Sequence, residues 1–404
     1  MANQPVQNAP RARTAAPLAP VLALTVLGSL GTGAVTNGLF FVTHEVLAFS
    51  EASNLLLALV MGASYTLGAW RAAPIIRTLA RRSARLTTKR VLLGVNAFLA
   101  GVSLLPYLAH GAEWAFWTMA AVYLPLTGIL WPVVEAYVSG GRTGAPLRRA
   151  TGAFNFAWSS AVLAAFWAMA PLLHDNPLGV VAGMAIVHVL ALVVSLALPA
   201  EPARHLEGAH EPHPPVYDRL LPVFRVLLTL SYVLVNALEP ILPARFAAMG
   251  VTATASARLA SVWAGARVVM FIVCGWWHGW HGRWRTVVWT ASTMLAGFAL
   301  AVAATNVTIA VIGLALFGIG AGGVYVAGIY YAMAVGKAEV DAGGTHETVI
   351  GLGYTAGPLP ALAAHGAVAG GLIGPDSLTL LTLGIVGAGV GIALWWAWRL
   401  SKRV

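Results

Sequence analysis

Long apolar stretches follow one another along almost the whole chain, and they constrain its fold more than any other feature. A helix needs about 20 apolar residues to cross the hydrocarbon core of a bilayer. Twelve such stretches are present, at about 17–42, 53–73, 91–109, 113–138, 150–173, 178–199, 220–243, 254–280, 286–304, 306–335, 347–373 and 378–399. Only 9% of the 404 residues are charged, whereas soluble domains have about 25%. The sequence therefore predicts an all-α membrane protein with twelve transmembrane helices, and it excludes soluble enzymes, nucleic-acid-binding proteins and disordered chains.

The basic residues are distributed unevenly between the two sides of these spans. If the N-terminus is cytoplasmic, 21 of the 24 Lys and Arg residues lie on the cytoplasmic side, while Arg245 and Arg258 lie toward the outside and Arg267 lies within a span. Because Lys and Arg concentrate in cytoplasmic loops, we predict that both termini are cytoplasmic, in the inner membrane of a bacterium. The net charge of +10 is then mainly an insertion signal, and no nucleic-acid partner is expected.

A polar segment and a weak internal similarity divide the chain into two halves. Residues 200–218 are rich in Pro, His and charged residues, as is typical of a solvated linker. This predicts an N-terminal six-helix bundle over 1–199, a cytoplasmic linker over 200–218 and a C-terminal six-helix bundle over 219–404. Short matches recur in the same order in both halves, among them Leu99-Ala100-Gly101 with Leu295-Ala296-Gly297, and Asn37 with Asn236. The two bundles are therefore predicted to be parallel repeats with a substrate site between them.

The arrangement of six plus six spans around a central loop resembles the major facilitator superfamily. That family carries a loop signature of the form Gly-x-x-x-Asp-Arg-x-Gly-Arg-Arg, of which the second copy is recognisable between spans eight and nine. Gly275, Gly282, Arg283 and Arg285 match it, and Gly279 stands where the acid is expected. The resemblance implies an alternating-access transporter whose loop lacks the acid of the usual gating motif.

Two charged residues within the spans require a partner or a function, because a charge at the bilayer centre costs about 2.5–3.5 kcal/mol on insertion scales. Arg267 lies near mid-depth of span eight without an equally central acid, so we predict that it binds an anionic substrate group. The alternative is a structural Arg tied to backbone carbonyls or to Glu239. Glu239 is the leading candidate for a proton carrier, and the rival interpretation makes it a fixed partner of Arg258 or Arg245 in an extracellular gate.

Two further acids lie near the predicted cytoplasmic ends of their spans. Glu135 on span four is close in sequence to Arg142, Arg148 and Arg149, which favours an inner gate pair over a ligand contact. Glu347 opens span eleven as a second gate candidate, and stabilisation by the helix dipole is a sufficient explanation for an acid at that position.

Spans five and eleven present polar and aromatic residues at matching positions. Asn155, Trp158 and Ser159 share one helix face, and Tyr354 with Thr355 occupies the corresponding place in span eleven. Together they predict a mixed polar and aromatic substrate pocket, with hydrogen bonds between helices as the alternative. Further cavity candidates, on spans that line the cavity in the resembling family, are Asn37, Tyr65, Asn236, Tyr325 and Tyr330.

These observations predict a secondary active transporter that moves a small polar or anionic organic solute, with coupling to protons left open. No cofactor or metal is expected, and the partners are the solute, the bilayer and protons, with the chain as a monomer. The single cysteine, Cys274, excludes a Cys-based zinc site. Three alternatives stay open: an exporter of amphiphilic drugs or metabolites, an intramembrane enzyme, and a transport-dead sensor with the same fold.

Overall fold

The computed structural model of the chain describes residues 14–83, 85–204, 213–335 and 344–402, and all regular structure within these ranges is helical. The first half contains α1 (Leu18–Gly33), η1 (Ala34–Gly38), α2 (Leu39–Leu47), α3 (Glu51–Arg82), α4 (Thr88–Ser103), α5 (Leu105–Leu108), α6 (Glu113–Ser139), α7 (Gly144–Met169), α8 (Leu172–Asp175) and α9 (Pro177–Ser195). The second half contains α10 (Val216–Leu238), η2 (Glu239–Ile241), α11 (Leu242–Ala248), α12 (Ala253–Ala260), α13 (Val262–Trp276), α14 (Trp284–Val302), α15 (Val307–Ala334), α16 (Gly344–Ala356), α17 (Leu359–Ala369), η3 (Pro375–Ser377) and α18 (Leu378–Ser401).

Eleven helical segments of the described chain are long and apolar enough to cross a membrane. The twelfth crossing is made by two shorter helices, α16 and α17, which together cover most of the predicted span 347–373 and end at Ala369. The break lies at Gly357-Pro358, because proline cannot donate a backbone hydrogen bond to the preceding turn. The predicted all-α fold of twelve crossings is therefore confirmed, with the correction that this span is not one continuous helix.

The first and seventh crossings are also interrupted, at corresponding places. In the first, η1 is a turn of π-helix that contains Asn37. In the seventh, η2 is a short 3-10 turn that begins at Glu239 and includes Pro240. Such irregular turns inside long helices are frequent at functional sites, and Asn37 and Asn236 lie at or next to the two interruptions.

Several predicted span limits differ from the helices observed. The helix α3 runs to Arg82, well beyond the predicted limit at residue 73, and carries Pro74 in its interior. The helix α13 ends at Trp276, so the last residues of the predicted span 254–280 form a loop. In the predicted linker 200–218, residues 205–212 lie outside the described ranges and α10 already begins at Val216. The limits were misjudged because amphipathic helix ends outside the apolar core look like loops in sequence.

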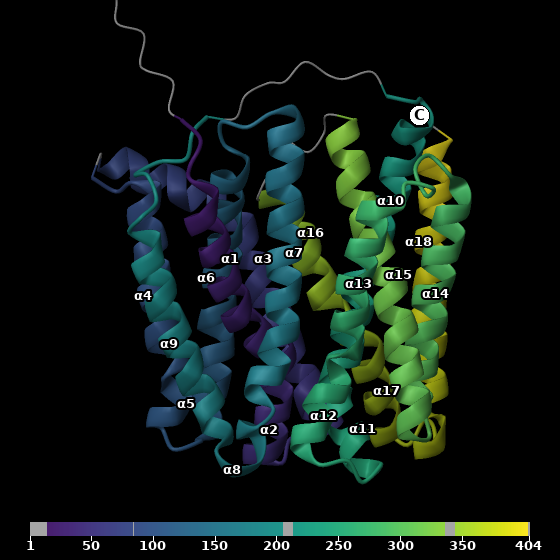
Figure 1. Cartoon of the computed structure of the whole chain (residues 1–404). Helices are drawn as coiled ribbons and strands as arrows, with labels where there is room; N and C mark the ends of the chain where they lie inside the picture. The colour runs from purple at the N-terminus through teal and green to yellow at the C-terminus, as the bar shows by residue number, and fades with distance from the viewer. Residues whose placement is uncertain (1–13, 84, 205–212, 336–343, 403–404) are drawn as a thin grey trace, which may run out of the picture.

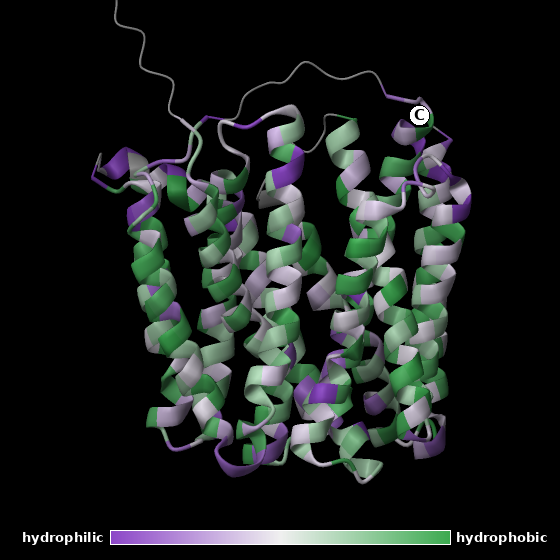
Figure 2. Ribbon diagram, viewed as in Figure 1, coloured by the Kyte–Doolittle hydropathy of each residue, from purple (hydrophilic) through white to green (hydrophobic). Residues whose placement is uncertain are grey.

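The helices form a bundle with two polar ends and an apolar belt between them (Figures 1 and 2). Both ends of the described chain lie at one end of the bundle, which we call the terminal face. The opposite end, where α2, α8, α11, α12 and α17 lie, is called the far face. The apolar belt identifies the chain as an integral, multi-pass membrane protein.

The two halves lie side by side and meet through α3 with α16 and through α7 with α13 (Figure 1). The α3–α16 contact is close, because a Cβ atom on Gly62 would lie 2.5 Å from the backbone carbonyl carbon of Tyr354. The hydroxyl oxygens of Thr66 and Thr355 are hydrogen-bonded at 3.0 Å across the same contact. Small residues allow helices in membranes to approach in this way.

Candidate functional site

A cavity of about 750 Å³, its mouth included, lies between the two halves. It is lined by residues of α1, η1, α3, α6 and α7 from the first half and of α10, α13, α15 and α16 from the second. Eight residues predicted from the sequence line it: Asn37, Tyr65, Glu135, Trp158, Arg267, Tyr325, Glu347 and Tyr354. Mixed polar and aromatic walls of this kind are typical of small-molecule sites.

Arg267 lies in this cavity with only 6% of its surface exposed. Its guanidinium group is 4.5 Å from the ring centroid of Trp158 and 4.5 Å from that of Trp263. Trp158 belongs to α7 and Trp263 to α13, so aromatic rings from both halves contact the same cation. The Nε atom of Arg267 has no hydrogen-bond partner among the described residues. The positive charge is thus held by aromatic faces, with hydrogen-bonding capacity left over.

The amide of Asn155 orders two aromatic residues of the cavity. Its Oδ1 atom accepts hydrogen bonds from the indole N–H of Trp158 at 3.1 Å and from the hydroxyl of Tyr325 at 3.1 Å. The rings of Trp158 and Tyr325 pack edge to face, with centroids 5.2 Å apart. Asn155 itself is not among the lining residues, and Ser159 is fully buried. Asn155 therefore joins α7 to α15 and positions the rings that line the cavity.

The face of α16 that carries Tyr354 is held by residues of α3 and α10. The ring of Tyr354 packs against Tyr65 at 5.6 Å and against Tyr232 at 5.5 Å. The side-chain amide of Asn236 donates a hydrogen bond to the backbone carbonyl of Tyr354, so Asn236 supports the wall without lining it. Asn37 does line the cavity, and its amide donates to the Thr36 hydroxyl at 2.9 Å.

Three acidic side chains are buried or half-buried near the cavity, but only two line it. Glu135 and Glu347 lie in the wall. Glu239 is 1% exposed and accepts a hydrogen bond from the indole N–H of Trp263. Its other carboxylate oxygen, Oε2, lacks a partner within the described part of the chain. Glu239 is thus linked to the Arg267 environment through Trp263.

The predicted gate partners are arranged differently from the expectation. Arg258 lies over the ring of Trp167 at 5.4 Å, whereas Glu239 bonds to Trp263, so the expected Glu239–Arg258 pair is replaced. Arg142, expected near Glu135, donates instead to backbone carbonyls, including that of Val138 at 2.7 Å. Burial of this half-covered guanidinium lowers the pKa of Arg142 from its usual value. The correct partners follow from helix rotation and depth, which sequence proximity does not report.

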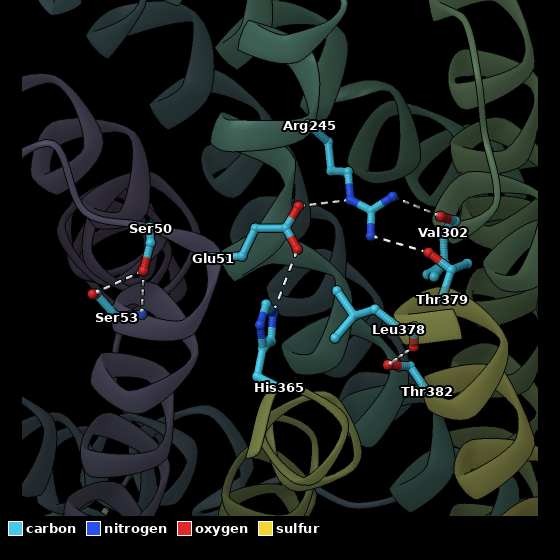
Figure 3. A network of polar contacts seen from close by, with 9 residues as sticks. All are labelled: Ser50, Glu51, Ser53, Arg245, Val302, His365, Leu378, Thr379 and Thr382. Atoms are coloured by element: carbon cyan, nitrogen blue, oxygen red, sulfur yellow. Dashed lines mark hydrogen bonds and ion pairs between the residues drawn. The ribbon is translucent and has the colours of Figure 1, made fainter. Parts of the chain in front are cut away.

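An ion-pair network at the far face joins the two halves (Figure 3). Glu51 on α3 accepts a hydrogen bond from Nε of Arg245 on α11 at 2.7 Å, and its other oxygen is 3.6 Å from His365 on α17. Arg245 also reaches the hydroxyl of Thr379 and the carbonyl of Val302, each at 3.4 Å. This network was not predicted from the sequence. Its only signal was that Arg245 stands among the few basic residues outside the predicted cytoplasmic loops.

The remaining predicted residues lie near the terminal face. Tyr330 does not line the cavity, and its ring stacks on His281 with centroids 4.2 Å apart. The motif glycine Gly282 has a φ of +65°, a left-handed conformation that favours glycine, and its N–H donates to the Tyr331 hydroxyl at 2.9 Å. Arg283 precedes α14 and Arg285 lies in its first turn, while Gly275 lies in the last turn of α13. The loop residues thus shape a turn away from the cavity.

Several lining residues were not predicted, among them Thr32, Thr36, Trp131, Phe154, Tyr232 and Trp263. Helical spacing was the available signal for two of them, because Tyr232 and Trp263 each precede a predicted residue by four positions. The described residues contain no cluster of three or more His, Cys, Asp or Glu side chains suited to a metal.

The whole chain is similar in fold to solved membrane transporters. A bacterial homologue of the human lysosomal transporter Spinster, solved in an inward-facing and unoccupied conformation, has a TM-score of 0.67 at 15% identity, covering 95% of this chain and 96% of that one. A structure described for substrate recognition in proton-dependent oligopeptide transporters has a TM-score of 0.66 at 12% identity, covering 96% and 98%. The nucleoside transporter NupG has a TM-score of 0.62 at 11% identity, covering 96% and 99%.

The chain therefore shares the fold of these solved transporters. This shared fold confirms the all-helical, twelve-crossing architecture that the sequence resemblance implied. No family model matches the sequence, and no curated protein sequence matches it.

Proposed function

We propose that the protein is a secondary active transporter that moves a small polar or anionic organic solute by alternating access. The supporting observation is Arg267, a buried cation in a cavity between the halves whose Nε has no hydrogen-bond partner among the described residues. A guanidinium group binds carboxylate and phosphate groups through a planar pair of donors. Its position between Trp158 and Trp263 fixes this donor pair without neutralising it.

The contact between the halves also supports alternating access. Rings from both halves contact Arg267, so a solute bound there touches both moving units. The Glu51–Arg245–His365 network holds the halves together at the far face. Because most basic residues gather toward the terminal face, we place that face in the cytoplasm of a bacterial inner membrane. The far-face network is then the closed external gate.

The remaining predicted residues take supporting roles in this proposal. Trp158, Tyr325 and Tyr354 form the aromatic walls, while Asn155 and Asn236 position them. Proton coupling is part of the proposal. The sequence favours Glu239 as the proton carrier, whereas the structure also places the acids Glu135 and Glu347 in the cavity wall. No catalytic role is proposed for the chain.

The test begins with a ligand-stabilisation screen of the purified protein over organic acids, sugars, amino acids and amphiphilic drugs. A compound that binds only the folded protein raises its melting temperature by mass action. We expect organic anions to be the strongest stabilisers, and Arg267→Ala to abolish both their stabilising effect and their uptake into vesicles. Arg267→Lys is the matched control, because it keeps the charge without the planar donor pair and should retain weak binding.

Three outcomes would contradict the proposal. Unchanged binding and uptake in Arg267→Ala would remove the site assignment. Stabilisation by uncharged amphiphilic drugs alone, with export from vesicles, would favour the alternative of a drug or metabolite exporter. Turnover of a lipid substrate in detergent would favour an intramembrane enzyme.

A further inference from the structure

Two acidic side chains from opposite halves meet in the wall of the cavity. Glu135 belongs to α6 in the first half and Glu347 to α16 in the second. The carboxyl group of Glu347 forms a side-chain hydrogen bond with that of Glu135. It also accepts a hydrogen bond from the hydroxyl of Tyr65 on α3. Glu347 is 6% exposed, so water does little to separate the two acids.

A hydrogen bond between two carboxyl groups requires a proton. Two carboxylates side by side repel each other strongly, and one member of such a pair therefore stays protonated. The Tyr65 hydroxyl cannot replace this proton, because it already donates to Glu347. We propose that Glu135 and Glu347 hold one shared proton across the contact between the halves, and that this is the coupling proton of the transporter, an inference that rests on the function proposed above.

The position of the pair links its proton to movement of the halves. Glu347 lies in the first turn of α16 and Glu135 in the last turns of α6, so both lie toward the terminal face. When the shared proton leaves to water in the cavity, two adjacent negative charges remain on helices of opposite halves. Their repulsion drives α6 and α16 apart and opens the terminal face. Uptake of a proton restores the hydrogen bond and closes it.

Other titratable and charged groups face the pair from the surrounding helices. Tyrosines surround it on four elements: Tyr65 on α3, Tyr232 on α10, Tyr325 on α15 and Tyr354 on α16. Arg267 on α13 is the cation in the same cavity. Arg148 on α7 and Arg225 on α10 are the cations nearer the terminal face on adjacent helices. Tyrosines and arginines keep one protonation state near neutral pH, so the pair is the group of this wall that changes charge.

Glu239 is less suited to this role, although it is also a buried acid. Its hydrogen bond is to Trp263, which belongs to the same half. A proton on Glu239 therefore changes contacts within the second half, whereas a proton on the Glu135–Glu347 pair changes a contact between halves. Only the latter alters directly how the halves fit together.

The experiment measures the distance between the halves at the terminal face in the absence of any solute. Spin labels are placed at Gly152→Cys on α7 and Gly275→Cys on α13 in a Cys274→Ser background. Both glycines have open space where a side chain would begin. The full-length protein is held in lipid nanodiscs and titrated from acidic to alkaline pH. We expect the distance to increase in one transition as the pH rises.

Single substitutions then assign the transition. Glu135→Gln and Glu347→Gln keep an amide in place of the carboxyl group, so we expect each to hold the low-pH distance throughout. Each should also remove the infrared band of the shared carboxylic proton, which we expect in the wild type at low pH. Glu113→Gln is the matched control, because Glu113 lies on the same helix but is exposed at its other end and bonds only to Trp117, and this variant should behave like the wild type.

The proposal is overturned if the wild-type distance ignores pH, or if Glu239→Gln abolishes the transition while the two pair variants retain it. Because two isosteric variants are used and no solute is present, a folding defect in one variant does not decide the result. Failure of the proposed function is recognised separately. In that case Arg267→Ala leaves uptake unchanged, whatever the distance measurement shows.

Discussion

Charged groups lie at two levels of the contact between the halves, and they are stabilised in different ways. At the far face, Glu51 meets opposite charges from the other half, with Arg245 at 2.7 Å and His365 at 3.6 Å (Figure 3). In the cavity, Arg267 meets aromatic rings, and Glu347 meets another acid. The far-face network is complete within the protein, whereas the cavity groups still have capacity for an anion or a proton.

The difference matches what the proposed transport cycle requires of each level. An ion-pair network that holds two halves together is most stable when every buried charge has a partner, because an unpaired buried charge is strongly unfavourable. A binding site needs groups that become fully satisfied only when the ligand is present. Aromatic rings stabilise a cation by about 0.5–2 kcal/mol without occupying its hydrogen-bond donors. The same fold therefore places a self-sufficient network at one level and an incomplete one at the other.

The largest effect is expected from changing the helix contact that aligns both levels. Gly62→Val places a branched side chain against the backbone of Tyr354, where even a Cβ would lie 2.5 Å from a carbonyl carbon. Backbone cannot move aside as a side chain can, so we expect a loss of about 3 kcal/mol or more and loss of transport. Thermal unfolding and vesicle uptake measure both. Gly101→Val, which meets open space on α4, should be nearly neutral, and equal effects of the two would disprove the close contact.

The next largest effect tests the far-face network separately from the cavity. Arg245→Ala removes the main partner of Glu51, and because this pair is only partly exposed we expect a loss of about 1–3 kcal/mol, between surface and buried pairs. The double substitution Glu51→Gln with Arg245→Ala should cost less than the sum of the single changes. Chemical labelling of a cysteine at Thr379 should increase, because the far face opens more often. Additive effects with unchanged labelling would show that the network does not hold the two halves together at the far face.

A smaller effect tests the aromatic support of Arg267. Trp158→Leu removes one ring that contacts the guanidinium and one hydrogen bond to Asn155. A contact of this kind contributes about 0.5–2 kcal/mol, so affinity for the anion found in the screen should fall about two- to thirtyfold. Trp167→Leu is the control, because its cation contact with Arg258 lies at the far face. Calorimetric binding constants that change equally in both variants would argue against a special role for the cavity.

The smallest effect concerns the pH dependence of stability and His281, which lies outside both the far-face network and the cavity. Burial and the neighbouring His278 lower the pKa of His281 below its usual value. The unfolded chain then binds a proton more readily than the folded chain once the pH falls below about 6.5, so the free energy of unfolding decreases on acidification. His281 is half exposed, and the change should stay below about 1 kcal/mol. His281→Phe keeps a ring against Tyr330 and should reduce the acid dependence of the melting temperature, and an unchanged dependence would assign it to other groups.

Local patterns were enough to predict the crossings and many cavity residues, while the pairings between helices were not. The positions of the spans follow from the length and polarity of each stretch, because a crossing helix must match the thickness of the hydrocarbon core. Arg267 stood out because few charges lie so deep, and Trp158 and Tyr354 stood out by matching positions in the two halves. The extension of α3 to Arg82 escaped prediction, because helix ends beyond the apolar core carry no such signal. The break at Gly357-Pro358 lies inside a continuous apolar stretch, so hydropathy alone did not show it, although a proline inside a helix is a local signal for a break.

The sequence by itself determined the all-helical membrane fold, the twelve crossings and the presence of a deep cation. Only the tertiary structure decided which charges face one another. Glu51 and Arg245 are 194 positions apart, and Tyr65 and Glu347 are 282 apart. Apolar periodicity constrains each helix against the lipid, but it leaves the rotation and depth of one helix relative to another undetermined. Those two quantities are set by packing between the halves, and they place Glu347 beside Glu135 and Arg267 between two tryptophans.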